Sequence, residues 1–415
     1  MNNSPKRRRS PGEGSVFEYE LTGGQTRYGI KFMATLPDGT RKQVLRRRDD
    51  NKQPWLTKKA AQTALREALG KVDKGEFVEP SKQTLGAYLD EWVSGLRLEA
   101  STIASYKKNI RLHLKPHGVG ATALAALTGP KITAHYRWLE EKGRQDHETG
   151  TGLSARTVRY IHTILSKALS EAVDAGLLSR NPAAKAKPPT AKQAKAPEMH
   201  PWSTDQLRVF LAWAKENSHL YVAWHVLAYT GMRRGELLAL RWRDIDLEAG
   251  TISVRRSVGV VRIKGEGAVV KEGDTKTAKP RVVDIDPATI TLLKTHKRDR
   301  GALALQLARD DALVFGDLEG AHRHPERFSR GFQDQLKRCE RAFTKGERET
   351  LPRIRLHDLR HTHATILLVG GKHLKMVSER LGHADPSITL RVYAHVMPGN
   401  QREAADWFAD LMASA

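Results

Sequence analysis

The sequence predicts an α+β protein with several domains: a small N-terminal three-stranded sheet plus a helix, an all-helical domain, and a mainly helical domain with a small antiparallel sheet. Three observations support this fold class. The chain has 415 residues, more than one ordinary hydrophobic core accommodates. Alternating apolar residues occur in short stretches near the N-terminus and after residue 250, whereas helical spacing dominates elsewhere. A basic, proline-rich stretch at residue 181 divides the chain.

The charge balance of the chain favours a polyanionic partner. Seventy lysines and arginines stand against 47 aspartates and glutamates, a formal net charge of +23. Such an excess is typical of proteins that bind nucleic acid. No apolar run approaches the roughly 20 residues that span a bilayer, so a membrane protein is not expected. The single cysteine, Cys339, cannot form an internal disulfide, which favours a reducing compartment.

The N-terminal region combines a basic arm with a small sheet. We expect residues 1–14 to be a disordered arm and residues 15–75 to form three strands covered by one helix. Tyr28, Ile30 and Phe32 alternate along the middle strand, and a later segment carries apolar residues at helical spacing. The candidate DNA-binding cations of this region are Lys6, Arg7, Arg8, Arg9, Arg27, Lys31, Arg41 and Lys42.

The region 81–180 is predicted to be an all-helical domain. Leu85, Leu89 and Trp92 follow the spacing of one helix face. The clearest helix begins after Ser154, a good N-cap residue, and ends at Gly176.

Residues 181–200 are predicted to be an extended basic linker. The stretch 181–197 contains four prolines and four lysines and no acidic residue, so we expect neither a helix nor a central strand. Its uniform positive charge favours a linker that runs along the phosphate backbone of DNA. The alternative is a linker that is exposed to solvent and only connects two domains. The candidate DNA-binding residues here are Lys185, Lys187, Lys192 and Lys195.

Residues 201–398 are predicted to form the third domain, with a separate helix in residues 399–415. The expected elements are helices at 203–217 and 219–230, strands around 251–257, 259–263 and 281–285, and helices thereafter. The last helix carries an apolar stripe of Ala404, Trp407, Phe408 and Leu411.

The stretch "LHDLRHTHAT", residues 356–365, places His357, Arg360 and His361 on one helix face and turns His363 away. Two histidines four residues apart could bind zinc. However, the intervening glutamate of a zinc protease is missing, and a cationic arginine beside a dication is unfavourable. A phosphate between the arginine and a histidine is the better interpretation.

Further residues could complete an anion site. Arg233 and Arg234 in "TGMRRGEL" precede a helix, where backbone N–H groups favour an anion, although a surface basic pair is the alternative. Lys276 lies at a turn in "GDTKTAKPRVV", where a lysine is usually solvated. His383 follows a helix end in "LGHADPSITLRVY", and Tyr393 on the next helix is by default a core residue.

Taken together in this order and spacing, these motifs resemble the tyrosine site-specific recombinases, specifically the lambda-like phage integrases. The catalytic resemblance covers roughly residues 200–400. The region 81–180 resembles the core-binding domain, and residues 15–75 resemble, more loosely, an arm-type DNA-binding domain. The resemblance implies a metal-independent phosphoryl transfer through a 3′-phosphotyrosyl intermediate, without a cofactor.

The resemblance also implies a role for each matching residue. Tyr393 matches the nucleophile, and Arg233 and Arg360 match the arginines that clamp the scissile phosphate. Lys276 matches the lysine that protonates the leaving 5′-oxygen. His357 would assist proton transfer and His383 would donate to a phosphate oxygen, with Glu236 and His361 in supporting positions.

The resemblance further implies partners and a location. They are double-stranded DNA with core and arm attachment sites, a homotetramer on that DNA, a DNA-bending host factor, an excisionase, and the cytoplasm of a bacterial host. The C-terminal helix would dock on a neighbouring subunit, the alternative being packing within its own. Alternative functions are a dimer-resolving recombinase with the same chemistry, a non-catalytic DNA-binding protein, and a metallohydrolase using His357 and His361.

Overall fold

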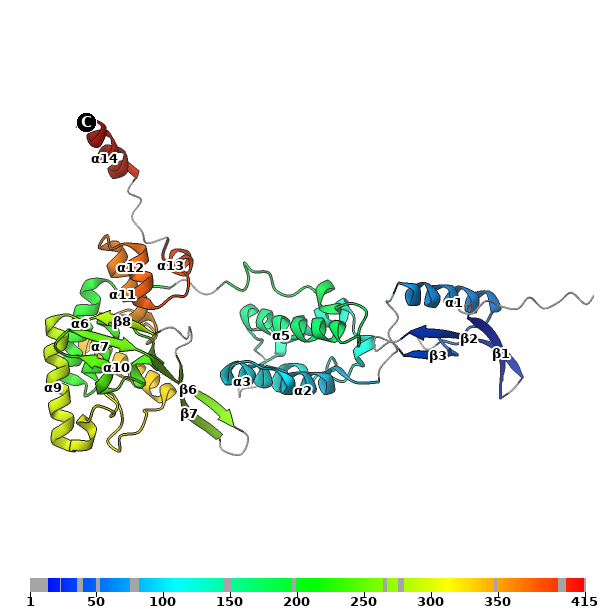
Figure 1. The fold of residues 1–415 in the computed structure, drawn as a ribbon, viewed down its shortest axis with the longest axis horizontal. Helices are drawn as coiled ribbons and strands as arrows, with labels where there is room; N and C mark the ends of the chain where they lie inside the picture. The colour runs from blue at the N-terminus through cyan, green and yellow to red at the C-terminus, as the bar shows by residue number, and fades with distance from the viewer. Residues whose placement is uncertain are drawn as a thin grey trace, which may run out of the picture. The chain divides into compact units, whose positions relative to one another are not determined.

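The computed structural model confirms the predicted fold class: a helix-rich chain with small antiparallel sheets (Figure 1). It describes residues 14–22, 24–35, 40–49, 53–74, 82–144, 151–195, 199–263, 267–274, 280–346, 349–394 and 401–413. The chain divides into two compact units, Met1–Ala196 and Pro197–Ala415. Among the described residues, no helix is both long and apolar enough to cross a bilayer.

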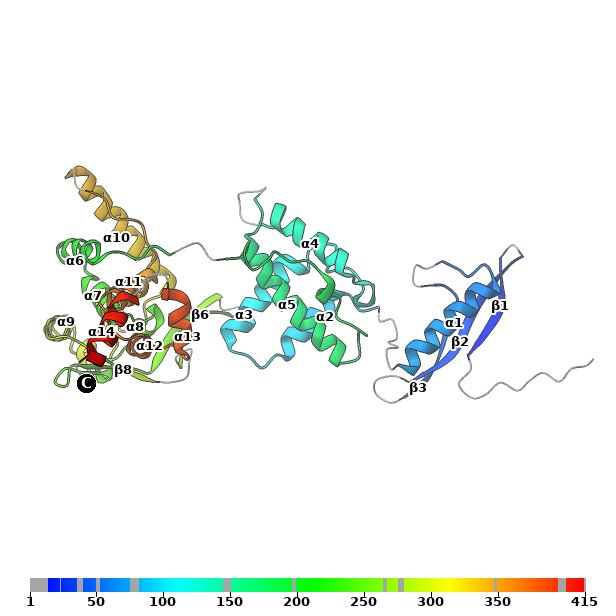
Figure 2. The ribbon, with the colours of Figure 1, turned by 90° about the horizontal axis from the view of Figure 1, so that it is seen from above.

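The predicted N-terminal sheet and its covering helix are present. The antiparallel strands β1 (Ser15–Leu21), β2 (Gln25–Thr35) and β3 (Arg41–Arg46) lie in sequence order. Helix α1 (Lys58–Asp73) crosses this sheet (Figure 2). The alternation in β2 buries Ile30 and Phe32 beneath α1, which leaves the odd-numbered residues of the strand on the opposite face.

The following helices form a second core. They are α2 (Leu85–Gly95), α3 (Ala100–Asn109), which continues as the π-helical turn η1 (Ile110–Leu114), η2 (Leu124–Ala126), α4 (Gly129–Lys142) and α5 (Ala155–Asp174). Ser154 caps α5 as predicted, because its hydroxyl accepts from the Thr157 N–H. The Trp92 indole donates to Glu171 over 2.7 Å and so joins α2 to α5.

The prediction of an extended linker is wrong for its first residues. Pro182–Lys185 form a short 3₁₀ helix, η3, which packs on α4 and α5 and buries Ala183. Asn181 begins this turn by accepting from the Ala183 N–H and donating to the Ser166 carbonyl oxygen. The small apolar residues give this segment a surface to bury, and proline is tolerated in a first turn. The lysines at 185, 187, 192 and 195 are all exposed.

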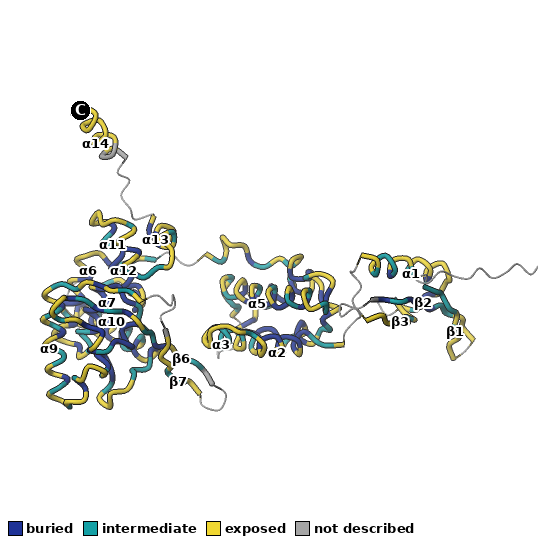
Figure 3. The backbone as a smooth tube through the Cα atoms, in the orientation of Figure 1, coloured by how far each residue is buried: buried dark blue, intermediate teal, exposed yellow. Residues whose placement is uncertain are grey.

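The second unit contains two small sheets among helices (Figure 1), and its buried residues are drawn dark blue in Figure 3. Its helices are α6 (Thr204–Asn217), α7 (Tyr221–Thr230), α8 (Arg234–Leu238), η4 (Trp242–Asp244), α9 (Pro287–Leu303), η5 (Leu305–Ala308), α10 (Pro325–Lys345), α11 (Asp358–Val369), α12 (Leu374–Leu381), α13 (Pro386–Tyr393) and α14 (Gln401–Ala413). Strands β4 (Ile245–Asp246), β5 (Thr251–Val254) and β8 (Arg281–Asp284) form one sheet, and β6 (Arg256–Ile263) and β7 (Gly267–Asp274) form a hairpin.

The sequence prediction missed β7. It also ended the first strand at residue 257, whereas β5 ends at Val254 and β6 begins at Arg256. Residues 267–274 begin with glycine and end in charged residues, so only a short apolar run remains to indicate a strand. The strand forms because it pairs along its full length with β6. Cross-strand pairing therefore stabilises a segment whose own sequence pattern is weak.

An aromatic cluster fixes the helices that carry the later part of this unit. Phe332 of α10 is in ring contact with Trp202, Phe210 and Trp224, all of them buried, and so joins α10 to α6 and α7. The Trp202 backbone N–H also donates to the Thr362 hydroxyl of α11 over 3.1 Å. The core therefore holds α11 directly.

Buried histidines predict that stability depends on pH. Desolvation lowers the pKa of His135 to about 4, while its ring donates to the His113 carbonyl oxygen over 2.9 Å. The unfolded chain therefore binds a proton below pH 6.5 that the folded chain does not, so stability falls as pH falls from 6.5 toward 4.

We expect thermal unfolding to show this effect. Lowering the pH from about 7 to about 5 should lower the Tm of the wild type more than that of His135→Gln. The titration of this one group is worth on the order of 1 kcal/mol. Equal pH shifts in the two proteins would contradict the assignment.

Candidate active site

The described candidate catalytic residues lie on or next to α7, α8, α11, α12 and α13, which come together in the second unit (Figure 2 labels these helices). Two glycines with positive φ make the turns possible: Gly231 (φ 64°) ends α7 and Gly382 (φ 67°) ends α12. A Cβ atom at Gly231 would lie 2.7 Å from the His363 ring, so the close approach of α7 and α11 also requires glycine. These turns bring residues separated by more than a hundred positions into one site.

Arg360 is the buried cation at the centre of the site. Its guanidinium donates to the Gly231 carbonyl oxygen and to the Leu381 carbonyl oxygen, each over 2.7 Å, and only 3% of the residue is exposed. Burial lowers its pKa to about 9, and the neighbouring charge of Arg233 adds to this effect. Arg360 is therefore still a cation at neutral pH, held by the ends of two helices.

Glu236 holds Arg233 in place from the first turn of α8. One carboxylate oxygen accepts from the Arg233 guanidinium and the other from the Arg233 N–H, each over 2.8 Å. Arg234 instead donates to Ser329 of α10 over 2.7 Å. The structure thus groups Arg233, and not Arg234, with the other site residues.

Arg281 is a site residue that the sequence prediction missed. It donates to both carboxylate oxygens of Glu236 (3.0 and 2.7 Å) and to the Arg380 carbonyl oxygen (3.0 Å). Burial alone would raise the pKa of Glu236, but the hydrogen bonds and charges of Arg281 and Arg233 lower it to about 2. The only sequence signal was an arginine at the start of a strand after "TKTAKP", which is unremarkable without the fold.

The Tyr393 hydroxyl lies inside the site. The residue is 1% exposed, and its oxygen lies 2.6 Å from Nδ1 of His361. Burial raises the pKa of Tyr393 to about 12, against the opposing effect of Arg360. Burial lowers the pKa of His361 to about 4, with a further contribution from His357. At neutral pH the structure therefore pairs a protonated phenol with an uncharged imidazole.

His357 and His383 flank this pair. His357 precedes α11 and is exposed, with its ring perpendicular to that of His361 at a centroid distance of 5.1 Å. Nδ1 of His383 lies 2.7 Å from the buried Thr389 hydroxyl. Desolvation lowers the pKa of His383 to about 4, and the charges of Arg360 and Arg233 add to this. Both arginines thus act electrostatically on the turn between α12 and α13.

The third histidine of the motif, His363, has a structural role. Its Nδ1 donates to the Ala228 carbonyl oxygen over 2.9 Å, and its Nε2 accepts from the Arg380 guanidinium over 3.1 Å. Both ring nitrogens are therefore used to hold α11 against neighbouring elements.

Several predicted residues cannot be placed with this cluster. Lys276 and the arm residues Lys6, Arg7, Arg8 and Arg9 lie outside the described residues. Arg27 and Lys31 lie on the face of β2 opposite the core, and Lys31, Arg41 and Lys42 are exposed. Within the described ranges, no three His, Cys, Asp or Glu side chains are grouped as ligands for a metal ion.

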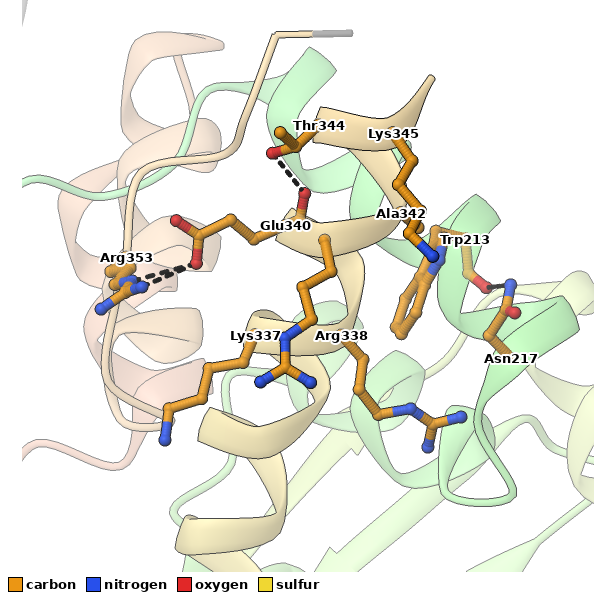
Figure 4. Close-up of a pocket in the computed structure, with 10 residues that line it drawn as sticks. Trp213, Asn217, Lys337, Arg338, Glu340, Ala342, Thr344, Lys345 and Arg353 are labelled. Atoms are coloured by element: carbon orange, nitrogen blue, oxygen red, sulfur yellow. Dashed lines mark hydrogen bonds and ion pairs between the residues drawn. The ribbon is translucent and has the colours of Figure 1, made fainter. Parts of the chain in front are cut away.

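A basic pocket elsewhere in the second unit shares no residue with the site. It has a volume of 780 Å³ between α6 and α10 and is lined by Trp213, Asn217, Lys337, Arg338, Glu340, Arg341, Ala342, Thr344, Lys345 and Arg353 (Figure 4). Its one carboxylate, Glu340, accepts from Arg353 over 2.8 Å. Most of the side chains that line the pocket are cationic or uncharged, and its threonine hydroxyl, Thr344, donates to the Glu340 carbonyl oxygen.

Comparisons with known proteins agree with the site. Residues 203–399 match the phage integrase family. The chain is 33% identical to the ICEBs1 integrase of Bacillus subtilis over 272 residues, which cover 64% of this chain and 68% of that protein. It is 28% identical to a tyrosine recombinase XerC-like protein of Caldanaerobacter subterraneus over 369 residues, 86% of this chain and 90% of that one.

A solved structure shows the same fold. The Tn1549 transposon integrase, in complex with a circular intermediate DNA, superposes with a TM-score of 0.63 at 20% identity and covers 78% of this chain and 98% of its own. At this identity the likeness shows the fold, and the sequence matches show the family. The chain belongs to the phage integrase family of tyrosine recombinases, enzymes that cleave and rejoin DNA.

Proposed function

We propose that this protein is a site-specific integrase that inserts a mobile element into DNA and excises it, through a covalent 3′-phosphotyrosyl intermediate. One observation carries the proposal: a buried tyrosine hydroxyl lies in the same site as the half-buried Arg233, held by a carboxylate, and the buried Arg360, held by backbone carbonyl oxygens. The integrase relatives, which include that of ICEBs1, support a role in a mobile element.

The proposed chemistry needs no metal or cofactor. Arg233 and Arg360 offset the charge that develops on the non-bridging phosphate oxygens, and His383 donates a hydrogen bond to one of them. Tyr393 attacks the phosphorus, Lys276 protonates the leaving 5′-oxygen, and His357 assists proton transfer. The covalent link conserves the energy of the diester, so rejoining needs no nucleotide.

The proposed DNA contacts are spread over several domains. We assign residues 15–75 to arm-type sites, 81–180 to core sites and 201–398 to catalysis. The exposed lysines of 181–200 and the outward cations of the N-terminal sheet would neutralise phosphates. A DNA-bending host factor and an excisionase would set the geometry and direction of the reaction.

The C-terminal helix supports the proposal of a tetramer on DNA. Trp407, Phe408, Leu411 and Met412 of α14 are all about half exposed or more. Such a stripe favours docking on a neighbouring subunit, which would couple the four active sites that exchange between two duplexes requires.

Resolution of DNA dimers is the second candidate function, because the chain is 28% identical to a XerC-like recombinase over most of its length. The predicted arm-type domain favours integration over this alternative.

Replacement of the nucleophile should abolish trapping without abolishing binding. We expect Tyr393→Phe to bind a nicked suicide substrate like the wild type and to form no covalent complex on a denaturing gel, because the variant lacks the attacking oxygen. Tyr221→Phe, in the same unit, is the matched control and should trap DNA normally. Trapping by Tyr393→Phe would refute the assignment of the nucleophile.

Cleavage should be insensitive to chelation. Strand cleavage and covalent trapping by the wild type in excess EDTA should equal those without it, because arginines and not a metal offset the charge of the phosphate. Strand cleavage that forms no covalent complex, is lost in EDTA and is restored by added Mg²⁺ or Zn²⁺ would instead favour the metallohydrolase that uses His357 and His361.

The apolar stripe of α14 should contribute to tetramer formation and not to the binding of a single half-site. We expect a Trp407→Ser, Phe408→Ser double variant to bind a single half-site normally but to form at least about tenfold fewer tetramers with full sites in sedimentation experiments, since two aromatic contacts are lost. Leu305→Ser removes a comparably exposed apolar side chain and should assemble normally. Unchanged tetramer formation by the α14 variant would argue for packing within the subunit.

A further inference from the structure

We propose that His361 is the group that takes the proton from Tyr393 when the phenol attacks DNA. This inference rests on the proposed function, and it gives a catalytic role to a residue expected only to support its neighbours. The observation that carries it is the 2.6 Å contact between Nδ1 of His361 and the Tyr393 oxygen.

The direction of this hydrogen bond follows from the chemistry of the two groups. A phenol can donate its proton, and an uncharged imidazole with its hydrogen on Nε2 presents an acceptor lone pair at Nδ1. His361 is half-buried and uncharged at neutral pH, and the charged or titratable groups near it are His357, Asp358, Arg360, Arg355, His383 and Tyr393. The acceptor therefore lies within hydrogen-bond distance of the phenol in the protein without DNA.

His357 is not in contact with the nucleophile. Its side chain is exposed and lies edge to face with His361, and the described residues show no hydrogen bond between His357 and Tyr393. Partial desolvation and the charges of Arg360 and Arg233 lower the pKa of its imidazole. His357 can therefore assist proton transfer on the substrate side, whereas His361 contacts the nucleophile.

The step balances without another reactant. The Tyr393 oxygen bonds to phosphorus as the bond from phosphorus to the 5′-oxygen breaks. The phenolic proton moves to Nδ1 of His361, which becomes imidazolium, and the 5′-oxygen takes a proton from Lys276. Rejoining reverses each transfer: the 5′-hydroxyl returns its proton to Lys276, and His361 returns its proton to the departing tyrosine oxygen.

The test measures single-turnover covalent trapping on a suicide substrate between about pH 6 and pH 10. His361→Asn keeps a hydrogen-bond acceptor near the phenol but cannot take its proton, and His361→Ala leaves space for added imidazole. We expect a loss of about 10²-fold near pH 7 in both variants. The loss should shrink about tenfold for each unit by which the pH rises, because attack without a base requires tyrosinate, whose fraction rises about tenfold per pH unit. Imidazole should restore part of the activity of His361→Ala.

The controls separate catalysis from folding. His225 is a buried histidine whose Nε2 lies 2.9 Å from the Thr289 hydroxyl, outside the site, so His225→Gln should keep wild-type trapping at every pH. Melting curves of all variants check folding, and His361→Asn serves if His361→Ala does not fold.

Two results would overturn the inference. One is wild-type trapping by both His361 variants. The other is a loss that stays constant with pH and does not respond to imidazole, which would show a positioning role only. If the wild-type protein itself traps no DNA, the proposed function fails instead, so the two failures are distinguishable.

Discussion

The arrangement of the active site depends on the ion pairs that the Glu236 carboxylate forms with two arginines. The carboxylate accepts from Arg233 on α8 and from Arg281 at the start of β8, and Arg281 in turn reaches the end of α12. A charged carboxylate that is buried this deeply needs its donors to offset the cost of desolvation. Arg233 and Arg281 likewise need the carboxylate to offset their own positive charge. Removal of either partner leaves an uncompensated charge, so the network specifies one geometry.

The same network leaves the site electrostatically incomplete. Arg233, Arg281 and Arg360 bring three positive charges to one negative charge at Glu236, and among the described residues the hydrogen-bond partners of Arg360 are backbone carbonyl oxygens. In the proposed mechanism, a phosphodiester would supply further negative charge. Donors already oriented by other bonds would need little reorganisation as charge develops on the phosphate, and such preorganisation is usually the largest source of transition-state stabilisation.

The sequence predicted those parts of the structure that local rules determine. The Ser154 cap, the glycine that ends α12 and the alternation in β2 each depend on a few neighbouring residues. The sequence did not predict η3 or β7, which exist because other elements cover or pair with them. Motif order and spacing predicted Arg233, Arg360 and Tyr393 as site residues, and the structure groups them. The bond from Arg281 to Glu236 and the contact of His361 with Tyr393 were not predicted, because they arise from long-range packing.

The resting site also couples the strength of the base to the presence of substrate. In the free protein, burial keeps the pKa of His361 near 4, and the positive charges of Arg360 and Arg355 contribute to this low value. In the proposed mechanism, a phosphate bound beside Arg233 and Arg360 would offset their positive charge, so the imidazole would become a stronger base. The buried phenol, with a pKa of about 12, is protonated in the free protein. The same phosphate would also offset the effect of Arg360 on the phenol, so under this mechanism the proton leaves only as the tyrosine oxygen bonds to phosphorus.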